Sequence, residues 1–131
     1  MKSRILALSK NEEFKKLLNQ KKVSNKYITI FFGYLNDKNK NRLNISFVTK
    51  KKIGNAVKRN KIKRRLRNIM NDACKEIPIN LKYSYLVIAK PTMLNNEFKK
   101  IKETLFQEFS KLKKWIFLQT YWSNLSKSIN I

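Results

Sequence analysis

KKKIGNAVKRNKIKRRLR, residues 50–67, is the most informative stretch of this sequence. It carries ten Lys or Arg and no acid, and the acid-free interval extends from Lys38 to Asn71. Apolar residues recur within and after it at intervals of three and four, which predicts an amphipathic helix. The stretch therefore predicts a helix that packs one side on a core and presents cations on the other.

This helix is expected to begin near Asn55 or Ala56 and to reach about Ile77, because Pro78 disfavours helical backbone in the residue before it. Its apolar stripe consists of Ile62, Leu66, Ile69, Met70, Ala73 and Ile77. At 100° per residue, the cations that face away from the stripe are Lys61, Arg64, Arg65 and Arg67. Arg59 points close to the stripe. Its side chain either extends past the stripe to contact a polyanion or stabilises the connector before the helix.

The net charge limits the choice of partner. The chain has 131 residues, enough for one compact domain, and a formal net charge of +23. Such charge repels itself in a compact state unless a polyanion neutralises it, and a nucleic acid is the partner that we favour. Acidic membrane lipid and a highly acidic protein are the alternatives. A merely solvated basic face would normally interleave Glu, which this one lacks.

The sequence contains few residues that could catalyse a reaction without help from a partner. The sequence has no His, and its eight Asp and Glu are scattered without a D-x-D or E-x-x-E spacing. No metal site in the protein is therefore expected, and a Mg²⁺ site made of carboxylates alone is the alternative, because folding can gather distant residues. The single Cys74 allows neither an internal disulfide nor a cysteine zinc cluster, which fits a reducing cytosol and predicts a cytoplasmic protein. The apolar run from Ile5 to Leu8 is too short for a signal peptide, and no stretch reaches transmembrane length.

The remaining segments predict an α+β domain in the order α-β-β-α-β-α, with a further short strand possible. Ser9 and Glu12 form an S-x-x-E capping box that predicts a helix to about Gln20. Residues 27–35 and 42–50 predict a β-hairpin about a turn at 36–41. Residues 83–90 predict a third strand. A final helix is expected from apolar residues at helical spacing: Leu94, Phe98, Ile101, Leu105, Phe109, Leu112 and Ile116.

The last residues, 115–131, form a C-terminal amphipathic extension after a domain at 1–114. Trp115, Leu118, Trp122 and Leu125 fall on one helical face. We expect this helix to continue and either to fold back on the domain or to make a crystal or partner contact. Membrane association is the less favoured use.

The basic segment resembles the signature of the bacterial ribonuclease P protein family, whose pattern runs KK-IGNAV-x-RNR-x-KR-xx-R. The matching positions are Lys51, Gly54, Asn55, Ala56, Val57, Arg59, Asn60, Lys61, Lys63, Arg64 and Arg67. Two departures are Lys61, where the family usually has the second Arg of RNR, and one extra residue in the KKK connector. Lysine retains the charge but not the bidentate geometry of arginine.

The resemblance implies a two-layer sandwich similar to domain 2 of ribosomal protein S5, with a left-handed βαβ crossover. Connections of this kind are otherwise almost always right-handed, so the handedness comes from the resemblance alone. It also implies a protein subunit that helps an RNA subunit remove the 5′ leader of precursor tRNA. In this family the RNA holds Mg²⁺ and cleaves the phosphodiester, so the protein alone is expected to be inactive. No membrane or obligate protein partner is expected.

The family pattern assigns two sets of binding residues and no catalytic residue. The set expected to bind the RNA subunit is Lys51, Lys52, Asn55, Lys58, Arg59, Asn60, Lys61, Lys63, Arg64, Arg65 and Arg67. The set expected to line a cleft for the 5′ leader is Phe14, Lys15, Leu18, Tyr27, Thr29, Phe31 and Lys50. Relatives often carry an aromatic residue where this chain has Leu18. Core packing is the competing interpretation for Phe14 and Phe31. A ribosomal protein and a self-sufficient nuclease are the rival functions.

Overall fold

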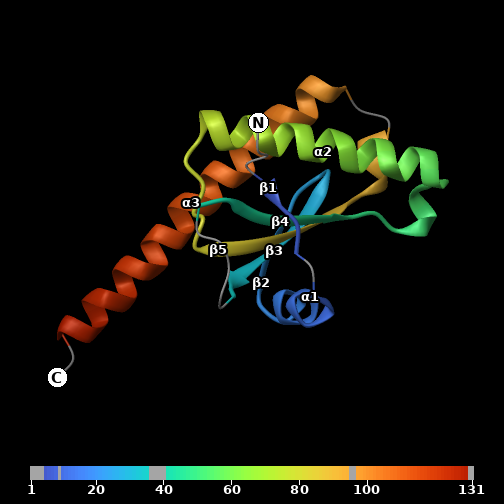
Figure 1. Ribbon diagram of the computed structural model, residues 1–131. Helices are drawn as coiled ribbons and strands as arrows, with labels where there is room; N and C mark the ends of the chain where they lie inside the picture. The colour runs from blue at the N-terminus through green and yellow to red at the C-terminus, as the bar shows by residue number, and fades with distance from the viewer. Residues whose placement is uncertain (1–4, 9, 36–40, 95–96, 130–131) are drawn as a thin grey trace.

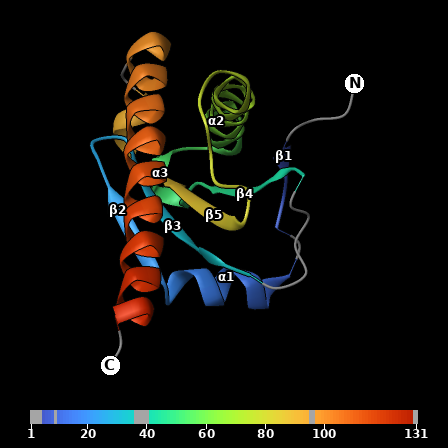
Figure 2. The same ribbon diagram turned by 90° about the vertical axis from the view of Figure 1, so that its left-hand side faces the viewer.

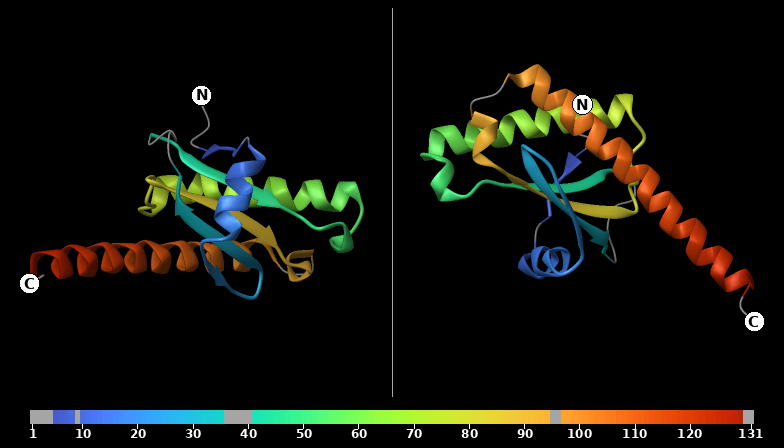
Figure 3. Two further views of the ribbon diagram at one scale, coloured as in Figure 1. Left: turned by 90° about the horizontal axis from the view of Figure 1, so that it is seen from below. Right: turned by 180° about the vertical axis from the view of Figure 1, so that it is seen from behind.

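The protein is an α+β sandwich with one helix on one face of a sheet and two helices on the other. The computed structural model describes residues 5–8, 10–35, 41–94 and 97–129. Helix α1 (Asn11–Leu18) covers one face of the five-stranded sheet, whereas α2 (Ala56–Glu76) and α3 (Phe98–Ile129) cover the other (Figures 1 and 2). Seen from below, α1 lies across the strands (Figure 3). The predicted α+β domain is confirmed.

The sheet has the strand order β1-β4-β5-β3-β2. Its strands are β1 (Ile5–Leu6), β2 (Lys21–Ser24), β3 (Ile28–Tyr34), β4 (Leu43–Val48) and β5 (Tyr83–Ala89). Two short 3-10 helices, η1 (Lys51–Ile53) and η2 (Pro91–Leu94), precede α2 and α3. Leu94 therefore belongs to η2 and not to the final helix, as its spacing had suggested.

The predicted hairpin between residues 27–35 and 42–50 is wrong. Both strands form, but β5 lies between them, antiparallel to β3 and parallel to β4. The hairpin partner of β3 is instead β2, in a register that pairs Lys22 with Phe31 and Ser24 with Thr29. Most of the expected turn at 36–41 lies outside the described residues. Strand adjacency depends on where the distant β5 inserts, and local sequence carries no signal for that.

The β4-α2-β5 unit connects two neighbouring parallel strands through a helix on one face of the sheet. In Figure 2, β4 and β5 run away from the viewer, α2 returns above them, and β5 lies to the left of β4. This geometry is a left-handed crossover, against the usual hand. The handedness implied by the resemblance is therefore the one that the chain adopts.

Two hydrophobic clusters hold the layers together, one on each side of the sheet. The larger cluster packs the apolar stripe of α2 and residues 101–116 of α3 against the sheet, with Leu66, Ile69 and Leu105 fully buried. The smaller cluster lies under α1 and centres on Leu8, Leu17, Leu35 and Leu86. The predicted stripe of α2 is confirmed from Ile62 to Ala73, which are buried; Ile77 is half-buried, just past the helix end.

The sequence predicted the start of α2 correctly and the start of α1 one residue too early. Helix α2 begins after the N-cap residue Asn55 and ends before Ile77, as expected. Helix α1 begins one residue later than the predicted capping box implies: Lys10 precedes its first turn, and the Lys10 N–H donates to Glu13 Oε1 at 3.1 Å. The reciprocal glutamate is thus Glu13 and not Glu12. Ser9 lies outside the described residues.

Helix α3 runs without a break through residues 115–129 of the expected extension, and residues 130–131 lie outside the described residues. The prediction of a continued helix is therefore confirmed, but the helix does not fold back on the domain. Its last part projects away from the sheet and the other helices (Figures 1 and 3), and Phe117, Leu118, Tyr121 and Trp122 are 50% to 66% exposed. A partner contact by this segment stays a prediction.

Candidate nucleic-acid interface

The connector before α2 places three cations next to the helix start. Lys50, Lys51 and Lys52 are exposed on and before η1, and the Lys58 N–H donates to the Asn55 side-chain oxygen at 3.0 Å. A Cβ on Gly54 would lie 2.9 Å from Lys58 Cδ, so the backbone there passes close to a lysine side chain. The IGN segment thus turns the chain tightly into the basic helix.

The outer face of α2 presents Lys61, Arg64 and Arg67, as helical projection had predicted, but Arg65 does not project clear of the stripe. Lys58, Asn60, Lys61, Arg64 and Arg67 are exposed, whereas Lys63 and Arg65 are half-buried at the margins of the stripe. Exposed cations on one helix face can follow a phosphate backbone, because each can neutralise a phosphate. The described geometry is therefore suitable for RNA contact along this face.

Arg59 is half-buried, in keeping with a projection close to the apolar stripe. Its Nε atom is buried and has no hydrogen-bond partner among the described residues. A buried donor without an acceptor costs free energy. An acceptor brought by a partner would therefore be favoured at this position.

A groove of about 560 Å³ lies between α1 and α2, along β4. One wall is formed by Lys63 and Arg67 of α2, and another by Phe14 of α1. β1 pairs with β4 only at Leu43 and Asn44, so the edge of β4 beyond them lines the groove. The structure thus brings residues from both predicted sets, the RNA-subunit set and the leader set, to one cavity.

The predicted leader residues of α1 and β3 are only partly assembled around this groove. Phe14 and Phe31 are half-buried and pack against the smaller core cluster, so each both fills the core and remains accessible. The ammonium group of Lys22 lies 5.9 Å from the centre of the Phe31 ring. Lys15 and Leu18 are exposed on α1, and neither lines the groove.

Tyr27 is not brought to this surface, contrary to the sequence prediction. It precedes β3, is only 4% exposed and belongs to the larger cluster on the opposite side of the sheet from α1. Alternation had placed it with Thr29 and Phe31, but it lies outside the strand where alternation holds. Thr29 does share the face of Phe31, and its Oγ1 lies 3.1 Å from Ser24 Oγ.

Several groove residues were not anticipated from the sequence. They are Ile5 and Ala7 near β1, and Ile45, Ser46, Phe47 and Val48 of β4. Ser46 also accepts a hydrogen bond of 2.8 Å from the Leu8 N–H, which holds the segment after β1 beside β4. Only the edge position of β4 could have indicated them, and that position follows from the strand order.

Other kinds of site find little support in the described part of the chain. No group of three or more His, Cys, Asp or Glu is placed to hold a metal ion in the described ranges. None of the described helices is long and apolar enough to span a membrane. Fold and site together define a small basic α+β protein with a cationic helix beside a groove.

The chain belongs to the ribonuclease P protein family. The family model described as Ribonuclease P matches residues 3–113. The ribonuclease P protein component of Mesoplasma florum is 35% identical over 91 residues, which cover 70% of this chain and 80% of that protein. That of Carboxydothermus hydrogenoformans is 32% identical over 111 residues, covering 83% and 92%. Membership makes this chain a subunit of an endoribonuclease of tRNA processing and argues against a ribosomal protein.

Solved structures agree with this assignment. A Staphylococcus aureus RNase P protein mutant superposes with a TM-score of 0.69 at 25% identity, covering 82% of this chain and 87% of its own. The RNase P protein from Thermotoga maritima gives a TM-score of 0.68 at 22% identity, with 81% and 96% covered, and so supports the fold.

Proposed function

We propose that this protein binds the RNA subunit of ribonuclease P through the outer face of α2 and the 5′ leader of precursor tRNA through the groove beside it. One observation carries the proposal: Lys63 and Arg67 of the basic helix line the same groove as Phe14 of α1. A strand of RNA in that groove would meet cations on one wall and an aromatic ring on the other, as single-stranded binding requires.

The proposed division of labour leaves bond cleavage to the RNA. Mg²⁺ would be held mainly by the RNA subunit, where it would activate water and stabilise the leaving oxygen. The sequence fits that view, because it has no His and only eight Asp and Glu. The protein then contributes phosphate neutralisation by lysine and arginine and positioning of the leader, so that the scissile bond meets the RNA active site.

Reconstitution tests this function directly. The protein is combined with a bacterial ribonuclease P RNA at low Mg²⁺, and release of the 5′ leader from precursor tRNA is followed by gel electrophoresis. We expect cleavage with both components and none with the protein alone. Leader removal by the protein alone would show that the division of labour is wrong and that the rival of a self-sufficient nuclease is right.

A second experiment asks which RNA the protein selects. The tagged chain is purified from cell extract and the bound RNA is sequenced. Enrichment of ribonuclease P RNA supports the proposal, whereas enrichment of ribosomal RNA with no ribonuclease P RNA contradicts it.

A further inference from the structure

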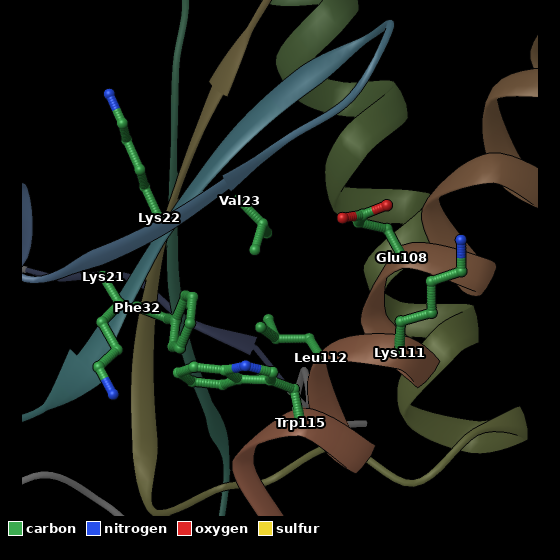
Figure 4. Close-up of a pocket in the computed structure, with 8 residues that line it drawn as sticks. All are labelled: Lys21, Lys22, Val23, Phe32, Glu108, Lys111, Leu112 and Trp115. Atoms are coloured by element: carbon green, nitrogen blue, oxygen red, sulfur yellow. The ribbon is translucent and has the colours of Figure 1, made fainter. Parts of the chain in front are cut away.

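A second cavity lies at the opposite edge of the sheet, beside β2, whereas the groove described above lies beside β1 and β4. It has a volume of about 640 Å³ and is bounded by β2, by β3 and by the middle of α3 (Figure 4). Strands β5 and β3 separate β2 from β4, and no residue of α1 or α2 lines this cavity. It is therefore distinct from the proposed interface for the RNA subunit and the leader.

The floor of the cavity is aromatic and apolar. Phe32 and Trp115 meet edge to face, with ring centroids 5.6 Å apart and an interplanar angle of 86°, and Val23 and Leu112 complete the wall. Phe32 is buried, but Trp115 keeps 37% of its surface exposed. The buried ring holds the indole in place, and the indole remains available to a ligand.

Cations stand on opposite sides of this aromatic floor. Lys21 Nζ lies 4.5 Å from the centre of the Trp115 ring, whereas Lys111 lines the opposite side of the cavity from α3, with its ammonium group pointing away from that ring (Figure 4). Between them the Glu108 side chain points toward the cavity, where it can accept hydrogen bonds. An exposed indole, two ammonium groups and one acceptor are the chemical groups that contact the base and the phosphates of a nucleotide.

We propose that this cavity binds a single-stranded segment of RNA, with a base against Trp115 and its phosphates at Lys21 and Lys111. Glu108 accepts a hydrogen bond from a donor group on the base edge. Trp115 lies beyond the residues that the family model matches, 3–113, so the site goes beyond the proposed family function. Leu118 and Trp122, exposed further along the same face of α3, extend the surface available to the strand.

Charge favours RNA over other occupants. The whole chain carries +23, and Lys21 and Lys111 stand beside the cavity against one glutamate, Glu108, whereas the side chain of Lys22 points away from it (Figure 4). A second copy of this chain would bring like charge to the site. An acidic protein segment would pair with the lysines, but its carboxylates would not stack on the exposed Trp115 indole, which packs edge to face with Phe32. Every nucleic-acid base, in contrast, has a face that can stack on an indole.

Fluorescence of Trp115 reports on this cavity alone once Trp122, the only other tryptophan, is replaced. The full-length Trp122→Phe protein is titrated with a short single-stranded oligouridylate, and total binding is followed in parallel by anisotropy of labelled oligonucleotide. We expect saturable quenching of the indole emission. RNA binding by anisotropy without any quenching would overturn the proposal.

Removing the cations tests which groups hold the strand. In the Lys21→Gln/Lys111→Gln protein the quenching should need more RNA, and the slope of log K against log salt should become shallower by about 1.4 units for two phosphates on a single strand. The matched control replaces Lys99 and Lys100, exposed at the start of α3 and outside the cavity, with Gln. An equal effect in both double variants would show that only net charge matters and that no site exists here.

Two further arms separate the proposal from its alternatives. Quenching of Trp115 by RNA should persist in the Lys61→Gln/Arg64→Gln/Arg65→Gln protein, because those residues do not line this cavity. If this triple variant loses the quenching, the RNA binds at the α2 face and not in the cavity. Polyglutamate should not quench Trp115. Quenching by polyglutamate and not by RNA would overturn the proposal in favour of an acidic protein partner. Circular-dichroism melts confirm that each variant is folded before titration.

Discussion

The side-chain oxygen of Asn55 accepts a hydrogen bond of 3.0 Å from the backbone N–H of Lys58, and this bond begins the helix that carries the basic face. The first turn of any helix has backbone N–H groups without helical partners, and an N-cap side chain satisfies one of them. The first turn of α2 contains no acidic residue, so Asn55 has no carboxylate there to support it. The start of the basic helix thus depends on one neutral side chain.

Replacing Asn55 with Ala should lower the free energy of unfolding by about 0.5–2 kcal/mol, the usual loss of an N-cap bond. Urea unfolding of the RNA-free protein measures this. Asn55→Ser is the matched control, because a serine oxygen caps about as well, and it should remain close to the parent protein. Equal loss in both variants would mean that the amide serves some purpose other than capping.

Replacing Lys61, Arg64 and Arg65 with Gln should weaken binding of the ribonuclease P RNA, most of all at low salt. If each cation neutralises one phosphate of a duplex-like RNA, the slope of log K against log salt should become shallower by roughly 2 to 3 units. Filter binding over a series of salt concentrations measures it.

The same triple variant should keep its stability, because Lys61 and Arg64 are exposed, Arg65 is half-buried, and Gln is nearly as good a helix former as Lys or Arg. Saturating protein should restore cleavage of precursor tRNA, since the leader groove is intact. An unchanged salt slope in a folded variant would place the RNA interface elsewhere.

Phe14→Ala should weaken binding of precursor tRNA more than binding of mature tRNA, because only the precursor has a leader to enter the groove. The expected loss is about 1–3 kcal/mol if a base stacks on the ring. Leu18→Ala is the control on the same helix, since Leu18 is 48% exposed and does not line the groove. Equal weakening for both tRNAs, with a lower melting temperature, would make Phe14 a core residue only.

Tyr85 should make stability depend on alkaline pH. Its hydroxyl donates to the Asn80 carbonyl oxygen at 2.8 Å, and burial, with a smaller effect from Tyr83, raises the pKa of Tyr85 well above the usual value near 10. Above about pH 10 an unfolded tyrosine releases its proton while the folded one retains it. Unfolding is then favoured by up to about 1.4 kcal/mol per pH unit.

Urea unfolding at pH 8, 10 and 11 of the parent and Tyr85→Phe proteins isolates this effect, because deprotonation of lysines is common to both. The stability advantage of the parent over Tyr85→Phe should shrink as the pH rises above 10. A constant difference across that range would show that Tyr85 titrates alike in the folded and unfolded chain.

Features that depend on neighbours in the chain were predictable from the sequence. Residues 55–77 contain their own N-cap, their own stop before Pro78 and an apolar stripe at helical spacing, so the limits and the buried side of α2 followed from local rules. The outward position of Lys61 and Arg64 followed from the same periodicity. The motif in this segment also led to the family, through a resemblance and not through geometry.

Tertiary structure alone decided which strands are neighbours and hence which residues share a cavity. β5, from residues 83–89, inserts between β3 and β4, which separates the strands of the expected hairpin and leaves part of β4 at an edge beside Phe14 and Arg67. The contact of Trp115 with Phe32 likewise joins two residues that are far apart in the sequence. Periodicity assigns a side chain to a face of its own element, but the identity of the opposing element depends on the lowest free energy of the whole packed chain.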